Sequence, residues 1–233
     1  MTTTTTSLKV GEVALCSLDR LRPTQCAAGM AHVMRKVDEL KTLKQSKGND
    51  QVVQFLQAHP APVVLKNHDI YLIDNHHLCR ALYELRGEFF SDLDFKSDTA
   101  TSTAPRCFVK VVSDLSAMDT ESFWKKMDDE RWVHPYDHNG KGPVPFNHIP
   151  THIKDLKDDI WRSVAALVKI QGGFKKTMIP YAEFQWANFF RENGNNGGST
   201  CTGDDKQAFQ EIVNKSMELA QDKSASHLPG YTG

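Results

Sequence analysis

The chain has 233 residues, and 28 Lys and Arg residues against 29 Asp and Glu residues leave a formal charge of −1. Proteins that coat duplex DNA through many phosphates usually carry a clear positive excess, so this charge disfavours a general DNA-coating protein. The composition, 39% hydrophobic and 24% charged, is that of a globular chain. The sequence contains no apolar run of about 18 residues, so it predicts no transmembrane helix and no membrane partner.

The chain ends and the cysteines favour a cytoplasmic protein. Residues 1–7 form a Thr-rich stretch without the basic start and apolar run of a secretion signal, and they predict a disordered tail. Residues 222–233 are polar and predict a frayed end. The cysteines have no CxxC spacing, which favours reduced thiols over disulfides or a zinc site; they are Cys16, Cys26, Cys79, Cys107 and Cys201.

Hydrophobic periodicity predicts alternating strands and helices in the first half of the chain. Apolar residues at steps of three and four predict a helix over 26–45. Two β-rich runs flank Asn67 and Asp69, which tolerate turn conformations, so they predict a hairpin. The elements expected in chain order are a strand within 8–18, helices over 26–45 and 51–58, strands over 62–65 and 70–73, a helix over 76–85 and a strand over 107–112.

The second half is predicted to be mainly helical. Residues 151–170 contain no Pro and precede a Gly pair, so one helix is expected there. Further helices are expected over 181–191 and 204–220, separated by a flexible Gly- and Asn-rich loop. Residues 133–150 are irregular and rich in His; their irregular spacing favours an ordinary loop over a metal site.

The densest polar constellation follows the second strand of the hairpin, at the predicted start of a helix. It consists of Asp74, Asn75, His76 and His77, with Arg80 four residues beyond His76 on the same helical face. A helix start presents unpaired N–H groups and attracts anions. A phosphate there would meet backbone amides, imidazoles and a guanidinium, so the segment predicts a phosphate site.

Two other interpretations of this segment stay open. Asp74 and Asn75 can simply cap the helix, with both histidines solvated. Asp74 can instead orient a histidine, act as a base or hold a metal ion. A metal site made by Asp74 and the two histidines alone is disfavoured, because adjacent side chains on a helix point about 100° apart.

The order of several short motifs resembles a known superfamily. The segments LRPTQ at 21–25, VVL at 63–65 and IDNHHLCRAL at 73–82 resemble the ParB/sulfiredoxin superfamily. The later segments WRS at 161–163 and YAEFQW at 181–186 resemble the ParB-like nuclease family more specifically. The resemblance implies an α/β fold: a small mixed sheet with packed helices over 8–115, and a mainly helical extension over 116–221 packed on that core.

The resemblance also implies phosphate chemistry. In relatives, the helix after the Asp-His motif binds the phosphate of a nucleotide or nucleic acid, and members include nucleases, CTP-dependent switches, an ATP-using sulfinic-acid reductase and free-serine kinases. Gln25, with Thr24, falls in the first motif of the superfamily, which lies near the nucleotide in relatives; Thr24 can instead simply cap a helix. Arg162 and Glu183 fall in the family-specific part, where they would contact phosphate and act as an acid or base, or form a buried structural ion pair.

The chain departs from the family pattern at two positions, Asn75 and Leu78. Asn75 stands where the family usually has Gly, and Asn tolerates the unusual backbone angles such a turn requires. Leu78 replaces an Arg that grips phosphate, and His76 stands where the sulfinic-acid reductases have their reactive Cys. Cys79 lies three residues later and is expected on the buried face of the helix.

Three functions follow as hypotheses. The first is a nuclease or nucleotide hydrolase, with Asp74, His76 and His77 as its polar centre and Mg²⁺ held between Asp74 and the phosphate. The second is a free-serine-type kinase in which Glu183 or Asp74 accepts the hydroxyl proton. The third is a non-catalytic module that responds to nucleotide. ATP, ADP or CTP would be substrate or ligand, and the charge favours a small phosphorylated ligand over nucleic acid.

Overall fold

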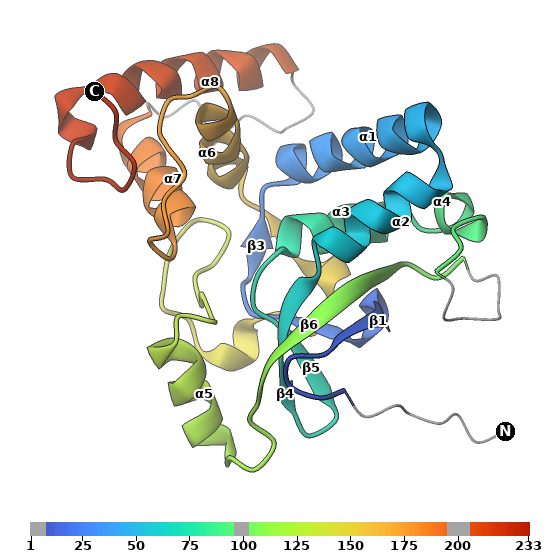
Figure 1. The fold of residues 1–233 in the computed structure, drawn as a ribbon. Coiled ribbons are helices and arrows are strands. Elements are labelled where there is room, and N and C mark those ends of the chain that lie inside the picture. The colour runs from blue at the N-terminus through green and yellow to red at the C-terminus, as the bar shows by residue number, and fades with distance from the viewer. Residues whose placement is uncertain (1–7, 96–102, 195–205) are drawn as a thin grey trace, which may run out of the picture. The chain divides into compact units, whose positions relative to one another are not determined.

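The computed structural model describes residues 8–95, 103–194 and 206–233 (Figure 1). The predicted tail over 1–7, Cys201 and most of the predicted Gly- and Asn-rich loop lie outside these residues. The chain divides into two units, and each is described by itself. Unit 1 consists of residues 1–26, 35–136 and 143–156, and unit 2 of residues 27–34, 137–142 and 157–233.

Unit 1 is built on a mixed sheet. In the described part of this unit, five strands lie in the order β1-β6-β4-β5-β2. The β1–β6 and β4–β5 pairs are antiparallel, whereas β4–β6 and β2–β5 are parallel. The small mixed sheet predicted from the resemblance is therefore confirmed. The strands are β1 (Val13–Ser17), β2 (Leu21–Pro23), β4 (Ala61–Lys66), β5 (Asp69–Leu72) and β6 (Arg106–Asp114).

The predicted hairpin is formed by β4 and β5. Lys66 pairs with Asp69 across the turn, and Asn67 adopts a left-handed conformation with φ 56°. This is the turn chemistry that the sequence predicts, because Asn accepts positive φ more readily than most residues. The hairpin matters for function because β5 leads directly into the Asp74 segment.

Helices cover the sheet of unit 1. Phe123 and Met127 of α5 pack in one buried cluster with Val64 of β4, and α2 and α3 contact β6. Helix α1 spans the unit boundary, with its first turn in unit 2. The helices are α1 (Met30–Lys47), α2 (Asn49–Ala58), α3 (His76–Glu84), α4 (Glu88–Ser91) and α5 (Thr120–Asp129), with 3-10 turns η1 (Leu18–Arg20), η2 (Phe146–His148) and η3 (Ile153–Asp155).

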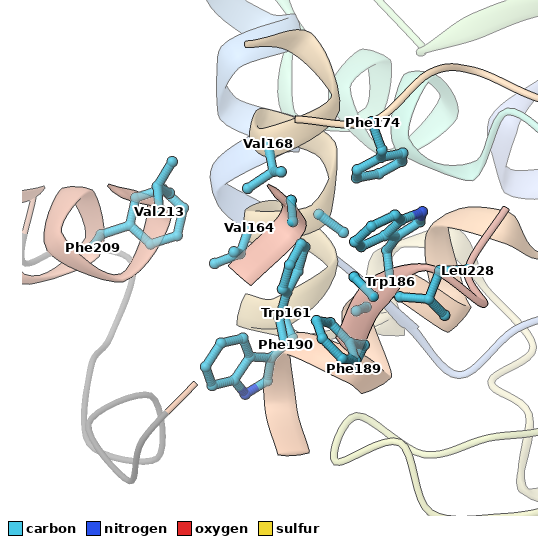
Figure 2. Packing of buried hydrophobic residues seen from close by; sticks show 14 residues of the cluster. Trp161, Val164, Val168, Phe174, Trp186, Phe189, Phe190, Phe209, Val213 and Leu228 are labelled. Carbon is cyan, nitrogen blue, oxygen red and sulfur yellow. The ribbon is translucent and has the colours of Figure 1, made fainter. Parts of the chain in front are cut away.

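Unit 2 is a helical body around an aromatic core. Trp186 is fully buried and stacks on Phe174 with 4.4 Å between ring centroids (Figure 2). Phe190 and Val164 belong to the same buried cluster. Its elements are β3 (Ala27–Ala28), which pairs in parallel with β7 (Lys157–Asp158), then α6 (Ile160–Ile170), α7 (Ala182–Asn193), α8 (Lys206–Gln221) and the 3-10 turn η5 (Lys223–Ala225).

The structure corrects the single helix predicted over 151–170. This stretch contains η3, the short strand β7 and α6 instead. Asp159 ends the irregular part, because its side chain accepts a hydrogen bond from the Trp161 amide and caps α6. The absence of Pro from 151–170 does not indicate where α6 begins. The Asp-Asp pair at 158–159, directly before the apolar run, is the sequence signal for a helix cap there.

The C-terminal residues do not fray as the sequence predicts. Ala225 and Leu228 are buried in the core of unit 2, and the Trp186 indole N–H donates to the Pro229 carbonyl at 2.7 Å. The Lys175 amide donates to the Gly230 carbonyl at 2.8 Å. Two apolar side chains and these hydrogen bonds hold a segment whose composition is mostly polar.

The boundary expected at residue 115 also differs from the structure. Helix α5 and residues 143–156 belong to unit 1, while residues 27–34 belong to unit 2. The reason is packing: Phe123 of α5 and Ile149 lie in the same buried cluster as Val64 of the sheet.

Among the described residues, we find no helix with both the length and the apolar character needed to span a bilayer.

Candidate functional site

The start of α3 is shaped by Asn75. This residue has φ 63° and ψ 23°, the left-handed conformation, and its own amide is bound by Asp74 Oδ1 at 2.7 Å. The expectation that Asn75 preserves a turn usually made by Gly is therefore confirmed. The Asn75 side chain makes no capping bond to the amides of the first turn; its Nδ2 approaches the Pro60 carbonyl at 3.4 Å instead.

His76 joins α3 to the first motif. Its side chain is 5% exposed, and Nε2 accepts a hydrogen bond from the Thr24 amide at 3.1 Å. Thr24 Oγ1 donates in turn to the Leu72 carbonyl at 2.7 Å. An imidazole that accepts at Nε2 carries its proton at Nδ1 and is neutral. The hydrogen bond from Thr24 to His76 holds the start of α3 against β2 and its following residues. In this tautomer, only Nδ1 of His76 can donate a hydrogen bond.

Arg80 is engaged away from the helix start. Its Nε pairs with Glu84 at 2.8 Å, one turn further along α3. Its Nη1 donates to the backbone carbonyls of Ile153, Lys154 and Leu156 at 3.4, 2.8 and 3.0 Å. The guanidinium that the sequence predicts on a phosphate therefore holds η3 in place in this conformation. A role toward phosphate stays a prediction that requires these bonds to rearrange.

Gln25 follows Thr24 in the chain and has an unsatisfied side-chain donor. The residue is 6% exposed, and its Nε2 is buried without a hydrogen-bond partner in the described part of the chain. The amide of the preceding residue, Thr24, donates to His76 Nε2, so the backbone of Gln25 is one residue away from this hydrogen bond. A buried amide without a partner costs about 1–3 kcal/mol, and such a group calls for an explanation. An acceptor atom of a bound ligand would satisfy this donor.

Residues of the predicted His-rich loop over 133–150 pair with the segment that contains Thr24 and Gln25. His134 forms a parallel β-bridge with Gln25, and the His134 amide donates to the Thr24 carbonyl at 2.8 Å. The rings of His134 and Tyr136 stack with centroids 4.4 Å apart and an interplanar angle of 23°. The sequence signal was only the His-rich composition of that loop, which does not reveal its pairing with the first motif.

Asp74 and His77 are the accessible side chains of the predicted centre. Asp74 is exposed and His77 is half-buried. Within the described ranges, no group of three or more His, Cys, Asp or Glu side chains is arranged to hold a metal ion. The expectation that Asp74 holds Mg²⁺ stays a prediction; Mg²⁺ commonly takes one or two carboxylates together with substrate phosphates.

Glu183 and Arg162 lie in unit 2. Glu183 forms an ion pair with Lys169, and the charge of Arg162 also acts on it. Burial favours the neutral form of Glu183, but the nearby charges of Lys169, Arg162 and His32 outweigh it and lower the pKa of this carboxyl. The Arg162 guanidinium stacks over the Phe184 ring at 3.4 Å. The proposed roles of Glu183 as base and Arg162 as phosphate ligand stay predictions.

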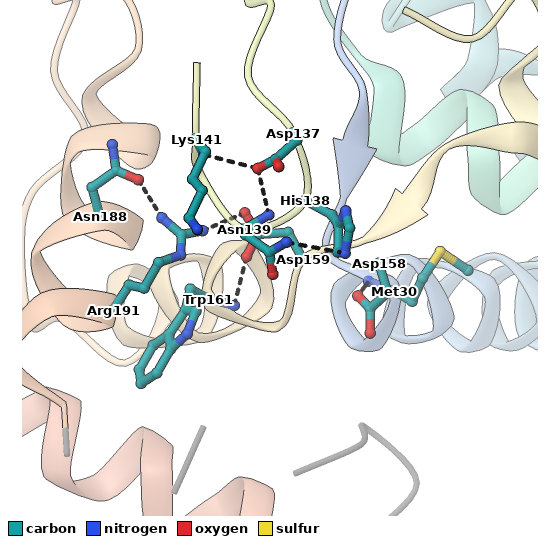
Figure 3. A network of polar contacts seen from close by, with 10 residues as sticks. All are labelled: Met30, Asp137, His138, Asn139, Lys141, Asp158, Asp159, Trp161, Asn188 and Arg191. Atoms are coloured by element: carbon teal, nitrogen blue, oxygen red, sulfur yellow. Dashed lines mark hydrogen bonds and ion pairs between the residues drawn. The ribbon is translucent and has the colours of Figure 1, made fainter. Parts of the chain in front are cut away.

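A second polar network in unit 2 is structural. Asp159 is 5% exposed; one of its oxygens caps α6 and the other accepts from Arg191 Nη2 at 2.7 Å (Figure 3). Arg191 also donates to Asn188 on its own helix. A Cβ added to Gly140 would overlap Arg191 Nη1, so the backbone of this glycine lies against the guanidinium. The network joins α6, α7 and the 137–142 loop.

The predicted burial of Cys79 is confirmed. Its side chain is fully buried, and it hydrogen-bonds with Cys107 of β6. This bond, together with burial, raises the pKa of the Cys107 thiol well above its usual value. Burial also raises the pKa of Cys16 to about 12. A raised pKa makes Cys107 and Cys16 poor nucleophiles.

Comparison with known proteins identifies the family. Residues 14–192 match the family described as "Putative ParB-like nuclease", so the chain belongs to this family. The crystal structure of protein Atu1540 from Agrobacterium tumefaciens is similar, with a TM-score of 0.74 and 30% sequence identity over 95% of this chain and 97% of that one. The curated proteins include no match to this chain.

Proposed function

We propose that this ParB-like protein binds a nucleotide or nucleic-acid phosphate at the start of α3 and hydrolyses it as a nuclease or nucleotide hydrolase. Two observations support the proposal: α3 starts at the left-handed Asn75 without a side-chain cap, and the amide of Thr24 binds His76 in the first turn of α3. Gln25 follows Thr24 in the chain, and its buried Nε2 has no hydrogen-bond partner among the described residues. The first amides of a helix have no acceptor inside the helix, and they suit an anion.

The hydrogen-bond donors of the proposed site are neutral groups that would bind phosphate oxygens. The amides of His76 and His77, the half-buried His77 imidazole and the Gln25 carboxamide would donate hydrogen bonds. The Asn75 amide would join them once Asp74 Oδ1, which it binds in this structure, releases it. Asp74 is the accessible carboxylate, and it would orient or deprotonate the attacking water, or hold Mg²⁺ against the phosphate. Since the formal charge of the chain is −1, one phosphate group suits this centre better than a long polyanion.

Turnover assays test the proposal. The protein is incubated with labelled ATP, ADP and CTP, and with supercoiled plasmid, with and without Mg²⁺. Asp74→Asn is expected to lower turnover at least 100-fold while nucleotide still binds, because this change removes the charge and keeps the shape. His77→Ala is expected to weaken binding. His68→Ala, in the exposed β4–β5 turn, is the matched histidine control.

The same assays separate the alternatives. Phosphate transfer to added serine would identify a free-serine-type kinase, and binding without any turnover would identify a nucleotide-responsive module. If Asp74→Asn and His77→Ala both behave like the His68→Ala control in binding and turnover, the assignment of the site to this helix start is wrong.

A further inference from the structure

The stacked pair His134 and Tyr136 occupies a distinctive position in unit 1. Three hydrogen bonds donated by backbone amides connect its segment to the start of α3: the Tyr136 amide donates to the His134 carbonyl, the His134 amide donates to the Thr24 carbonyl, and the Thr24 amide donates to His76 Nε2. The backbone that carries the two rings is therefore connected through Thr24 to the first turn of α3, and His134 is also bridged to Gln25.

The chemistry of the pair suits a planar ring. Both side chains are half-buried and stack on each other rather than in the core. Aromatic side chains in such a position accept a further ring by offset stacking, and stacking of this kind tolerates any nucleobase. The neighbouring Gln25 Nε2 adds a buried donor that has no acceptor in the described part of the chain, and base edges and phosphates both offer acceptors.

We propose that His134 and Tyr136 form a ring subsite, so that the ligand of this protein is a nucleoside phosphate whose base stacks on the pair while its phosphate lies at the start of α3. This rests on the proposed phosphate site. It specifies that the ligand carries a base, and it adds two specificity-determining residues. The base can belong to a free nucleotide or to the end of a single strand, and both present the same chemistry.

A competing ring pair sharpens the test. Phe55 and His59, at the end of α2, also stack, with centroids 4.3 Å apart, and Pro60 beside them meets the Asn75 side chain. This second pair lacks the bridge to Gln25. We therefore expect Phe55 to be dispensable for base recognition, and Phe55→Leu serves as the matched variant for Tyr136→Leu.

The experiment measures Kd by calorimetry for ATP, for inorganic triphosphate and for a short single-stranded oligonucleotide. Tyr136→Leu is expected to raise the Kd of ATP about tenfold and leave that of triphosphate unchanged, since stacking is lost while the phosphate contacts remain. Tyr136→Trp is expected to restore ATP binding, and Phe55→Leu to bind as the unmodified chain does. Whether ATP or the oligonucleotide loses more affinity in Tyr136→Leu identifies the source of the base.

The outcomes separate this inference from the proposed function. If the unmodified chain binds triphosphate as tightly as ATP, or if Phe55→Leu weakens ATP binding and Tyr136→Leu does not, the ring subsite is refuted and the phosphate site stands. If neither ATP nor triphosphate nor the oligonucleotide binds, the proposed function itself fails. Thermal unfolding of each variant shows that the fold is retained.

Discussion

At the scale of single residues, two structural requirements explain Asn75 and His76 in the segment that starts α3. Asn75 must adopt positive φ to turn the chain from β5 into α3, and His76 must present a neutral Nε2 to the Thr24 amide. The sequence reveals the first requirement, because Asn replaces Gly at a turn. It does not reveal the second, because a contact between residues 52 positions apart depends on how β2 and β5 pair.

Substitution of Asn75 tests the first requirement. Asn75→Ala is expected to lower the free energy of unfolding by about 1 kcal/mol, because a Cβ without a compensating side chain disfavours the left-handed region. Asn75→Gly is expected to be neutral or slightly stabilising, since Gly reaches this region without strain. Urea unfolding measures both. Equal stability of the two variants would contradict the argument.

Substitution of His76 tests the second requirement. His76→Leu fills the volume but leaves the buried Thr24 amide without its acceptor, so the free energy of unfolding is expected to fall by about 1–3 kcal/mol. His76→Gln keeps an acceptor and is expected to lose less. A His76→Leu variant as stable as the unmodified chain would show that the Thr24 contact contributes nothing.

At the scale of elements, unit 2 depends on charged pairs between helices. Asp159 at the start of α6 binds Arg191 of α7, and Lys169 near the end of α6 binds Glu183 near the start of α7. The two pairs lie at opposite ends of α6. Because the side chain of Asp159 is only 6% exposed, its charge depends on the partner more strongly than that of a surface residue.

Removal of Arg191 is the first element-scale prediction. Arg191→Leu leaves the Asp159 carboxylate buried without its partner, and breaking such a pair typically costs about 3–5 kcal/mol. Lys125→Leu removes one partner of the exposed Lys125–Asp129 pair in α5 and is expected to change the free energy of unfolding far less, because water screens this pair. Urea unfolding of both variants is the comparison, and a similar loss in each would refute a buried role for Arg191.

The pH dependence of stability follows from Glu183. The folded state lowers the pKa of this carboxyl from 4.5, so the unfolded state binds more protons as the pH falls through this range. The stabilisation is present above the unfolded value and is lost as the pH drops through the folded value. Glu183→Gln is expected to show a shallower loss of stability between neutral pH and acid, measured by urea unfolding at a series of pH values. Identical slopes would show that Glu183 does not contribute.

Long periodic elements were predictable, and short ones fixed by distant pairing were not. Helix α1 and the β4–β5 hairpin follow from apolar spacing and from Asn67 in the turn. The two-residue strands β3 and β7 carry no local signal, because they exist only through their pairing with each other. The candidate site divides in the same way: Asp74 to His77 were visible as a run, whereas Gln25, His134 and Tyr136 meet only through the fold of unit 1.

At the scale of the whole molecule, the formal charge favours a smaller ligand than the nuclease description of the family suggests. The chain belongs to the ParB-like family, but its formal charge is −1 and its donors gather around one helix start in unit 1. Because a nuclease that tracked a long strand would need a broader positive surface, we expect only a shallow dependence of nucleotide affinity on salt.

The central claim is that Gln25 and the start of α3 bind a nucleotide phosphate, and Gln25→Leu tests it most directly. This change removes a buried donor that has no partner in the described chain and replaces it with an apolar side chain of similar size. Calorimetric titration with ATP, ADP and CTP is expected to show a Kd raised at least tenfold, while the free energy of unfolding without ligand stays equal or rises by about 1 kcal/mol. Unchanged nucleotide affinity in a folded Gln25→Leu protein would contradict the account.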